Sequence, residues 1–140
     1  MTFTSWRGTM GLIKPTHRPG SLEETIRLLP EGIGLVPVTV GLRKGDRKDF
    51  DGAITAIEEK VAELAEIGVD LIAPAGAPPL MVHGYEGERK LIDKWEQTYG
   101  LPVITAGGSQ VQAMRALGAK RIVGVTYFNG EISNINLTSN

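Results

Sequence analysis

The stretch "LIAPAGAPPL", from Leu71 to Leu80, decides the fold class. It begins as an apolar run, stops at Pro74 and continues into a turn of glycine, alanine and proline. A helix-forming run follows at 87–99. A buried strand that leads through a loop into a helix is the repeating unit of α/β proteins, which bind their ligands beyond the carboxyl ends of the strands. The stretch therefore predicts a fold class and also the place of a ligand.

The same order of strand, loop and helix recurs along the whole chain. Apolar runs predict strands at 10–15, 33–41, 69–76, 101–108 and 121–128, and periodic segments predict helices at 21–29, 49–68, 87–99 and 109–120. Such alternation predicts an α/β domain with a mostly parallel sheet of four or five strands, flanked by helices. We expect a flavodoxin-like arrangement with the first and third strands central. Pro37 predicts an edge position or a bulge for the second strand.

Caps and periodicity give further expectations for the helices. Ser21 and Glu24 predict a capping box, and Ser109 is the predicted N-cap of the last helix. Gly68, Gly100 and Gly118 are the predicted stops. The side chains expected to point inward are Leu22, Ile26, Leu29, Ile54, Ile57, Val61, Leu64, Leu91, Ile92, Trp95, Val111, Met114 and Leu117. The glutamates expected on solvated surface are Glu58, Glu59, Glu63 and Glu66.

Composition predicts one soluble globular domain. The chain has 140 residues, of which 41% are hydrophobic and 22% charged, with a net charge of -1. This balance provides no field that would attract nucleic acid or an anionic membrane, so neither is an expected partner. The amino terminus lacks a basic start followed by a long apolar stretch, and no apolar run is long enough to span a membrane. The expected location is the cytoplasm.

The chain contains no cysteine and only two histidines. Disulfides, thiolate metal sites and cysteine nucleophiles are therefore absent from this sequence. The histidines, His17 and His83, have no metal-binding spacing and are expected to be ordinary loop residues. Phosphate-binding glycine motifs are also missing, so nucleotide binding has little support.

Four loops follow the predicted strands, at 15–20, 75–87, 106–110 and 127–131. The loop at 106–109 leads into the start of a helix, where free N–H groups attract anions. Arg18 places a cation in the first loop, where it either binds a substrate carboxylate or is only a solvated charge. Glycines in these loops are equally compatible with ordinary turn chemistry.

The segments "MGLIKP", "LIAPAGAPP" and "YGLPVITAGGSQVQAMRALGAKRIVGVTYFNGEI" occur in this order. From Met10 to about Ile132 the chain resembles the aspartate/glutamate racemase superfamily, in its arylmalonate decarboxylase and maleate isomerase branch. The resemblance implies an enzyme of two similar parallel-sheet lobes with the active site between them. It also implies transfer of a proton or carbon dioxide next to a carboxylate, without metal or organic cofactor, and with a cysteine in the second lobe.

The resemblance also implies which residues bind substrate. In the loop after the first strand these are Pro15, Thr16 and Arg18, and the others are Gly76, Ala77, Pro78, Tyr127 and Phe128. Ala77 takes the place of the reactive residue of the first lobe but has neither thiol nor hydroxyl, and Pro78 lacks an N–H. A two-cysteine mechanism is therefore excluded at this site, and no residue is assigned as catalytic.

The predicted domain is an amino-terminal lobe at 1–128, followed by a polar tail at 129–140 that is expected to be truncated or disordered. The resemblance implies a decarboxylase (a lyase) or an isomerase acting on a small dicarboxylate of the substituted-malonate type. The alternative is a non-catalytic lobe that binds small carboxylates, or an inactive fragment, because the chain alone has no cysteine. A small carboxylate is the expected partner, and a homo-oligomer is an open alternative for assembly.

Overall fold

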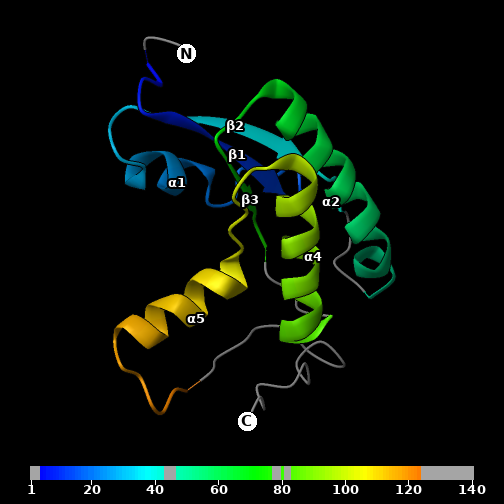
Figure 1. Ribbon diagram of the computed structural model, residues 1–140, viewed down its shortest axis with the longest axis vertical. Coiled ribbons are helices and arrows are strands. Elements are labelled where there is room, and N and C mark those ends of the chain that lie inside the picture. Colours follow the sequence, from blue (N-terminus) through cyan, green and yellow to red (C-terminus); the bar gives the residue numbers. More distant parts are fainter. Residues whose placement is uncertain (1–3, 43–46, 77–79, 81–82, 124–140) are drawn as a thin grey trace.

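The computed structural model describes residues 4–42, 47–76, 80 and 83–123, and within them a parallel sheet flanked by helices (Figure 1). The strands are β1 (Gly8–Lys14), β2 (Ile33–Thr39) and β3 (Leu71–Pro74), in the order β2-β1-β3. The central β1 pairs with β2 from Gly8↔Ile33 to Lys14↔Thr39 and with β3 from Met10↔Leu71 to Ile13↔Pro74. The α/β class, the parallel pairing, the central first strand and the edge position of the second are confirmed. The third strand was expected to be central as well, but β3 lies at the edge of the three-stranded sheet and has only one isolated bridge on its other side.

The prediction of four or five strands was wrong, because the described residues form three. The fourth predicted strand, at 101–108, makes only the bridge Ile72↔Val103, supported by backbone bonds of 3.0 Å from Ile72 to Pro102 and from Ile104 to Ile72. Pro102 has no N–H for a ladder, and the next helix begins at Ala106, so too little chain is left for a strand. Residues 121–123 have no regular structure, and the rest of the fifth predicted strand lies outside the described residues.

The helices are α1 (Leu22–Leu28), α2 (Arg47–Ile67), α4 (Gly84–Tyr99) and α5 (Ala106–Ala116). Two predicted caps were wrong. Ser21 occupies the N-cap position of α1, but its side chain makes no capping bond, so the predicted capping box is absent; its carbonyl accepts the Thr25 hydroxyl (2.8 Å). Thr105, and not Ser109, caps α5, because its hydroxyl accepts the Gly108 N–H (3.0 Å).

The hydrophobic core lies on both faces of the sheet, because side chains of β1 alternate between them. On one face Ile13 packs with α2 and α4, and its fully buried companions include Val61, Leu64, Ile72 and Trp95. On the other face Met10 and Leu12 pack against α1 through Leu22 and Leu29. The inward faces predicted for α2 and α4 are thus confirmed at these core positions.

Two predicted inward side chains point to solvent instead. Ile26 in α1 is 56% exposed, since this short helix contacts the sheet through Leu22 and Leu29. Leu117 is 84% exposed, and no residue of α5 is buried. Figure 1 shows the reason: α5 runs away from the sheet and does not lie across it.

Glu58 was predicted to be solvated surface, but it connects α2 to α4. Its Oε1 accepts from Lys94 Nζ at 2.7 Å and from Trp95 Nε1 at 3.3 Å. The hydrogen bond from Lys94 is the main cause that lowers the pKa of Glu58, and the Trp95 bond also lowers it, while burial opposes them. The connection anchors the otherwise buried indole of Trp95.

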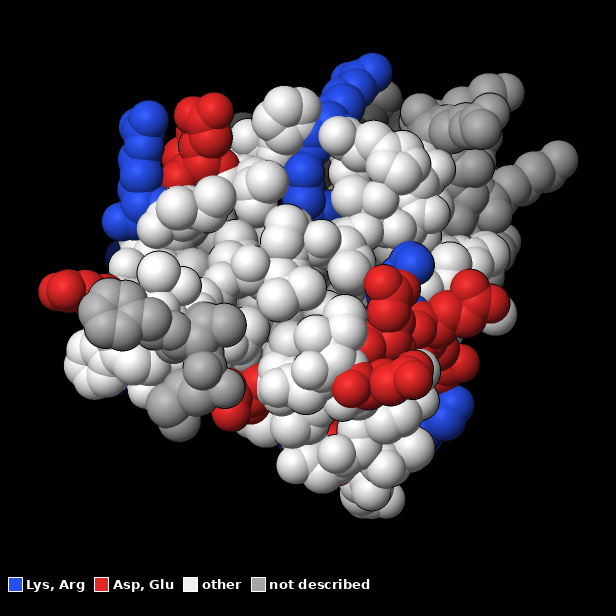
Figure 2. All heavy atoms as spheres, turned by 90° about the horizontal axis from the view of Figure 1, so that it is seen from above, with Lys and Arg blue, Asp and Glu red and all other residues white. Residues whose placement is uncertain are grey.

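The charged side chains are distributed unevenly over the surface. On the face shown in Figure 2, acidic side chains gather on one side, while the basic side chains stand apart from one another. This face therefore carries no basic patch among the described residues. None of the helices in that part of the chain is long and apolar enough to cross a membrane.

Candidate functional site

The carboxyl ends of the three parallel strands meet at one edge of the sheet, and backbone hydrogen bonds tie together the loops that follow. After β2, Val40 N donates to Lys14 O (2.9 Å) and Leu42 N to Pro15 O (2.8 Å). After β3, Ala75 N donates to Ile13 O (2.8 Å). The loop after β1 is therefore fixed on both sides. We call this loop cluster, residues 14–18, 40–42 and 75–76, the sheet-edge site.

Pro15 and Gly76, two of the predicted substrate-binding residues, lie against each other in this site. Gly76 has φ +87, and a Cβ built on it would stand 2.9 Å from Pro15 Cγ. A side chain at position 76 would therefore be strained and would also displace the proline ring. The requirement for glycine follows from close packing between two binding loops.

Lys14 is the functional candidate that sequence reasoning missed. It closes β1 and is only 9% exposed, and its Nζ donates to Arg18 O at 2.6 Å. An ammonium has three N–H donors, and among the described residues one of them is used here. The signal was present in the sequence, because a lysine ends an otherwise apolar strand directly before a proline. A buried cation of this kind stabilises an anion brought beside it.

Arg18 and Thr16 complete the described part of the loop. Arg18 is exposed and Thr16 is half-buried. The Lys14 contact holds the Arg18 backbone, so the arginine side chain leaves from a fixed point of the sheet edge. Arg18 makes no ion pair with any of the described residues. Two cations, one buried and one exposed, are therefore at or beside this loop.

The two histidines lie in different loops, and neither belongs to a cluster of metal-ligating side chains among the described residues. His17 Nδ1 lies 2.9 Å from the Thr39 hydroxyl, which links the loop after β1 to the end of β2. His83 is the residue before α4 and makes no capping bond through its side chain. Both placements agree with ordinary loop residues. Within the described ranges no three metal-ligating side chains come together.

Four predicted substrate-binding residues lie outside the described residues: Ala77, Pro78, Tyr127 and Phe128. Their assignment stays a prediction from the resemblance. What the described part of the site offers is positive charge, a tightly packed proline and glycine, and loops held by backbone bonds. This combination can bind and orient a carboxylate, and it supplies no thiol, because the chain contains no cysteine.

Comparison with known proteins places the sequence in a family. The family model described as arylmalonate decarboxylase matches residues 10–139. No curated protein sequence matches the chain.

Solved structures of arylmalonate decarboxylase and of maleate isomerases share the fold. A maleate isomerase variant from Pseudomonas putida S16 with maleate has a TM-score of 0.76 at 20% identity, covering 91% of this chain and 56% of that one. A double mutant of arylmalonate decarboxylase in its liganded form has a TM-score of 0.69 at 21% identity, covering 79% and 47%. A maleate cis-trans isomerase mutant from Nocardia farcinica has a TM-score of 0.64 at 20% identity, covering 79% and 49%. This chain spans about half the length of these structures.

Proposed function

This chain belongs to the arylmalonate decarboxylase family, and from that membership we propose that it is the lobe that holds a small dicarboxylate in a cofactor-independent decarboxylase or isomerase. The substrate class is a substituted malonate or a similar short diacid. The observation that carries the proposal is the pair of cations at the sheet edge, with Lys14 buried and bonded to the backbone of Arg18.

The chemistry explains why cations belong there. When a malonate loses carbon dioxide, the electron pair of the broken bond stays on the carbon next to the remaining carboxylate. Negative charge then spreads onto that carboxylate until a donor protonates the carbon. Cations held in a fixed position beside the carboxylate stabilise this charge as it develops. Lys14 and Arg18 would bind and orient the carboxylate, while a thiol from outside this cysteine-free chain would deliver the proton.

The second candidate function is binding without turnover, and the absence of cysteine favours it. The two candidates differ in one product. Incubation of phenylmalonate with a decarboxylase releases carbon dioxide and leaves the protonated monoacid, whereas a binding lobe returns the diacid unchanged. Both candidates need the same carboxylate site.

Calorimetric titration tests that site with phenylmalonate and succinate as ligands. A charge-assisted hydrogen bond contributes about 1.5–3 kcal/mol, so Arg18→Ala should weaken binding by about tenfold or more. Arg27→Ala is the matched control, because Arg27 is an exposed arginine of α1 whose nearest acid, Glu23, lies 3.8 Å away. Equal affinity of the wild type and both variants, or no binding to any of them, would refute the proposed site.

A further inference from the structure

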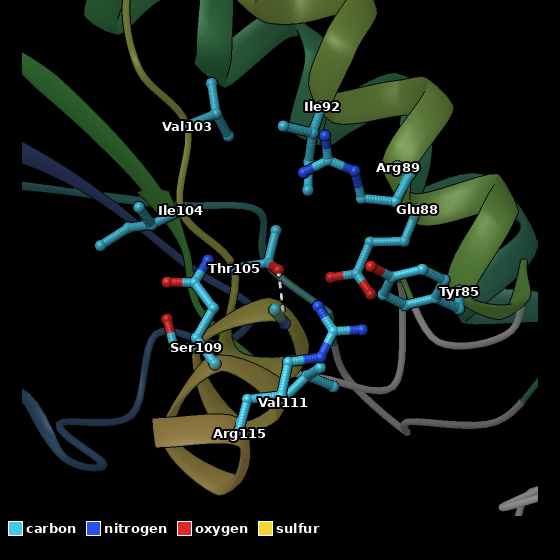
Figure 3. A pocket seen from close by; sticks show the side chains of 12 residues that line it. Tyr85, Glu88, Arg89, Ile92, Val103, Ile104, Thr105, Ser109, Val111 and Arg115 are labelled. Atoms are coloured by element: carbon cyan, nitrogen blue, oxygen red, sulfur yellow. Dashed lines mark hydrogen bonds between the residues drawn. The ribbon is translucent and has the colours of Figure 1, made fainter. Parts of the chain in front are cut away.

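A cavity of about 330 Å³ lies between α4 and α5 (Figure 3). Both helices and the segment 103–105 line it, and it shares no lining residue with the sheet-edge site. Its volume is in the range of small-ligand pockets, which begin at about 300 Å³. The residues in its wall show what kind of ligand it fits.

Glu88 of α4 contributes a buried carboxylate without a partner. The residue is 6% exposed, and its Oε1 has no hydrogen-bond partner among the described residues. Both carboxylate oxygens lie beside the first turn of α5, where a Cβ on Gly107 would stand 3.1 Å from Oε2 and 3.4 Å from Oε1. The N-terminal end of a helix favours negative charge. The anion position predicted for the loop at 106–109 is thus next to a carboxylate of the chain itself, whose Oε1 can accept from a ligand.

Arg115 of α5 faces the same cavity and has no ion-pair partner among the described residues. Figure 3 shows Glu88 and Arg115 pointing into the pocket from opposite helices. No ion pair within 4.0 Å joins them, and none of the described residues pairs with Arg115. Arg89, the other arginine of the wall, is already bonded to Asp93 at 3.1 Å. Among the described residues, the cavity therefore has one carboxylate, that of Glu88, and one guanidinium, that of Arg115, which are available to a ligand.

Part of the remaining wall is apolar, and the rest carries the polar side chains of Tyr85, Thr105, Ser109 and Gln112. Ile92 and Val103 are 5% and 6% exposed and belong to the main core cluster. A ligand that fits all three features carries an ammonium, a carboxylate and a short aliphatic group. An ammonium would donate to Glu88, a carboxylate would accept from Arg115, and the aliphatic group would cover Ile92 and Val103.

We propose that the α4–α5 pocket binds a small aliphatic α-amino acid as its zwitterion. The proposal is independent of the function assigned to the sheet-edge site, because the two sites share no residue. It also accounts for the buried, unpartnered oxygen of Glu88, a feature that native structures rarely leave unexplained.

The test titrates three matched probes into the whole chain: leucine, leucinamide without the carboxylate, and N-acetyl-leucine without the ammonium. Amide shifts in ¹H–¹⁵N spectra report both affinity and location. Leucine should bind at least tenfold more tightly than either single-charge probe. Glu88→Gln should remove that advantage, and so should Arg115→Gln. Glu86→Gln, at an exposed glutamate of the same helix, should leave leucine binding unchanged.

Three outcomes would overturn the proposal. They are no saturable shifts with leucine, equal affinity for the three probes, or leucine binding that survives both pocket substitutions. Arg115→Gln keeps the test decisive if Glu88→Gln perturbs the fold, because Arg115 is exposed on a helix without buried residues. If the acid and the base only pair with each other in solution, leucine will not bind and the proposal fails.

Discussion

The sheet with α2 and α4 and the segment 101–123 are built in opposite ways. In the first region a continuous core surrounds Ile13, Leu64 and Ile72, each at most 1% exposed. In the second, one bridge at Val103 joins the chain to the sheet, and α5 has no buried residue. The packed core is therefore built by the three strands and the helices on their faces. The later segment is added to it through few contacts.

This contrast also separates the two sites. The sheet-edge site is formed by loops whose backbones are bonded to one another and to the strands of the packed region. The α4–α5 pocket has one wall in that region and one wall in α5. Substitutions that compare the two regions therefore test whether recognition at the sheet edge depends on the packed part alone.

The largest difference is expected in stability. Leu64→Ala removes a fully buried side chain and should lower the free energy of unfolding by about 2–5 kcal/mol. Leu117→Ala, at a leucine that is 84% exposed, should change it by less than about 0.5 kcal/mol. Urea unfolding of both variants gives the two values. Similar losses would mean that the second region packs as firmly as the first, which would contradict the difference described between them.

A smaller effect is expected on ligand affinity. Lys14→Met keeps the length of the side chain but removes the ammonium that donates to Arg18 O. Loss of a charged donor costs about 1.5–3 kcal/mol, so phenylmalonate should bind about tenfold more weakly or worse. Lys120→Met removes the same charge from the second region and should leave the affinity unchanged. Fluorescence-monitored titration measures both, and equal effects would make net charge, rather than the site, the cause.

The smallest effect is on pH dependence. The hydrogen bond from Lys94 lowers the pKa of Glu58 in the folded chain below its ordinary value of 4.5, so this carboxyl releases a proton on folding at acidic pH. The stabilisation is therefore complete above pH 4.5 and is lost as the pH falls through the lowered folded value. The pair is partly exposed, so the amount is at most about 1 kcal/mol.

Thermal unfolding followed from neutral to acidic pH checks this. The wild type should lose more stability on acidification than Lys94→Met, because the variant lacks the partner that lowers the pKa. Lys90→Met, at another exposed lysine of α4, is the control and should follow the wild type. Identical acid profiles for the wild type and Lys94→Met would contradict a stabilising bond between Lys94 and Glu58.

The sequence predicted the packed region well and the second region poorly, for a physical reason. In α2 the apolar side chains recur with the helical period, so Ile57, Val61 and Leu64 could be assigned to the core without coordinates. At 101–108 the apolar run looks like a strand. The strand is cut short by the missing N–H of Pro102 and by the early cap at Thr105. Those local features outweigh the hydrophobic pattern.

The candidate sites show the same division. Arg18 could be named because loops after parallel strands converge at one edge, whereas Pro15 and Gly76 were named from the family resemblance. The sequence did not reveal Lys14 and Glu88, because their importance lies in burial and in the partners they have or lack. Periodicity shows which face a side chain takes. The fold as a whole determines whether a charged group on that face is buried.

The central claim, that the sheet edge recognises carboxylates, is tested most directly by mapping where phenylmalonate binds. ¹H–¹⁵N spectra of the chain are recorded during titration with phenylmalonate and, as the uncharged control, phenylmalonamide. We expect saturable shifts of the Thr16, Arg18 and Gly76 amides with the diacid alone. In the Lys14→Met, Arg18→Ala double variant these shifts should be lost. Shifts confined to α5, or shifts that persist unchanged in the double variant, would contradict the claim.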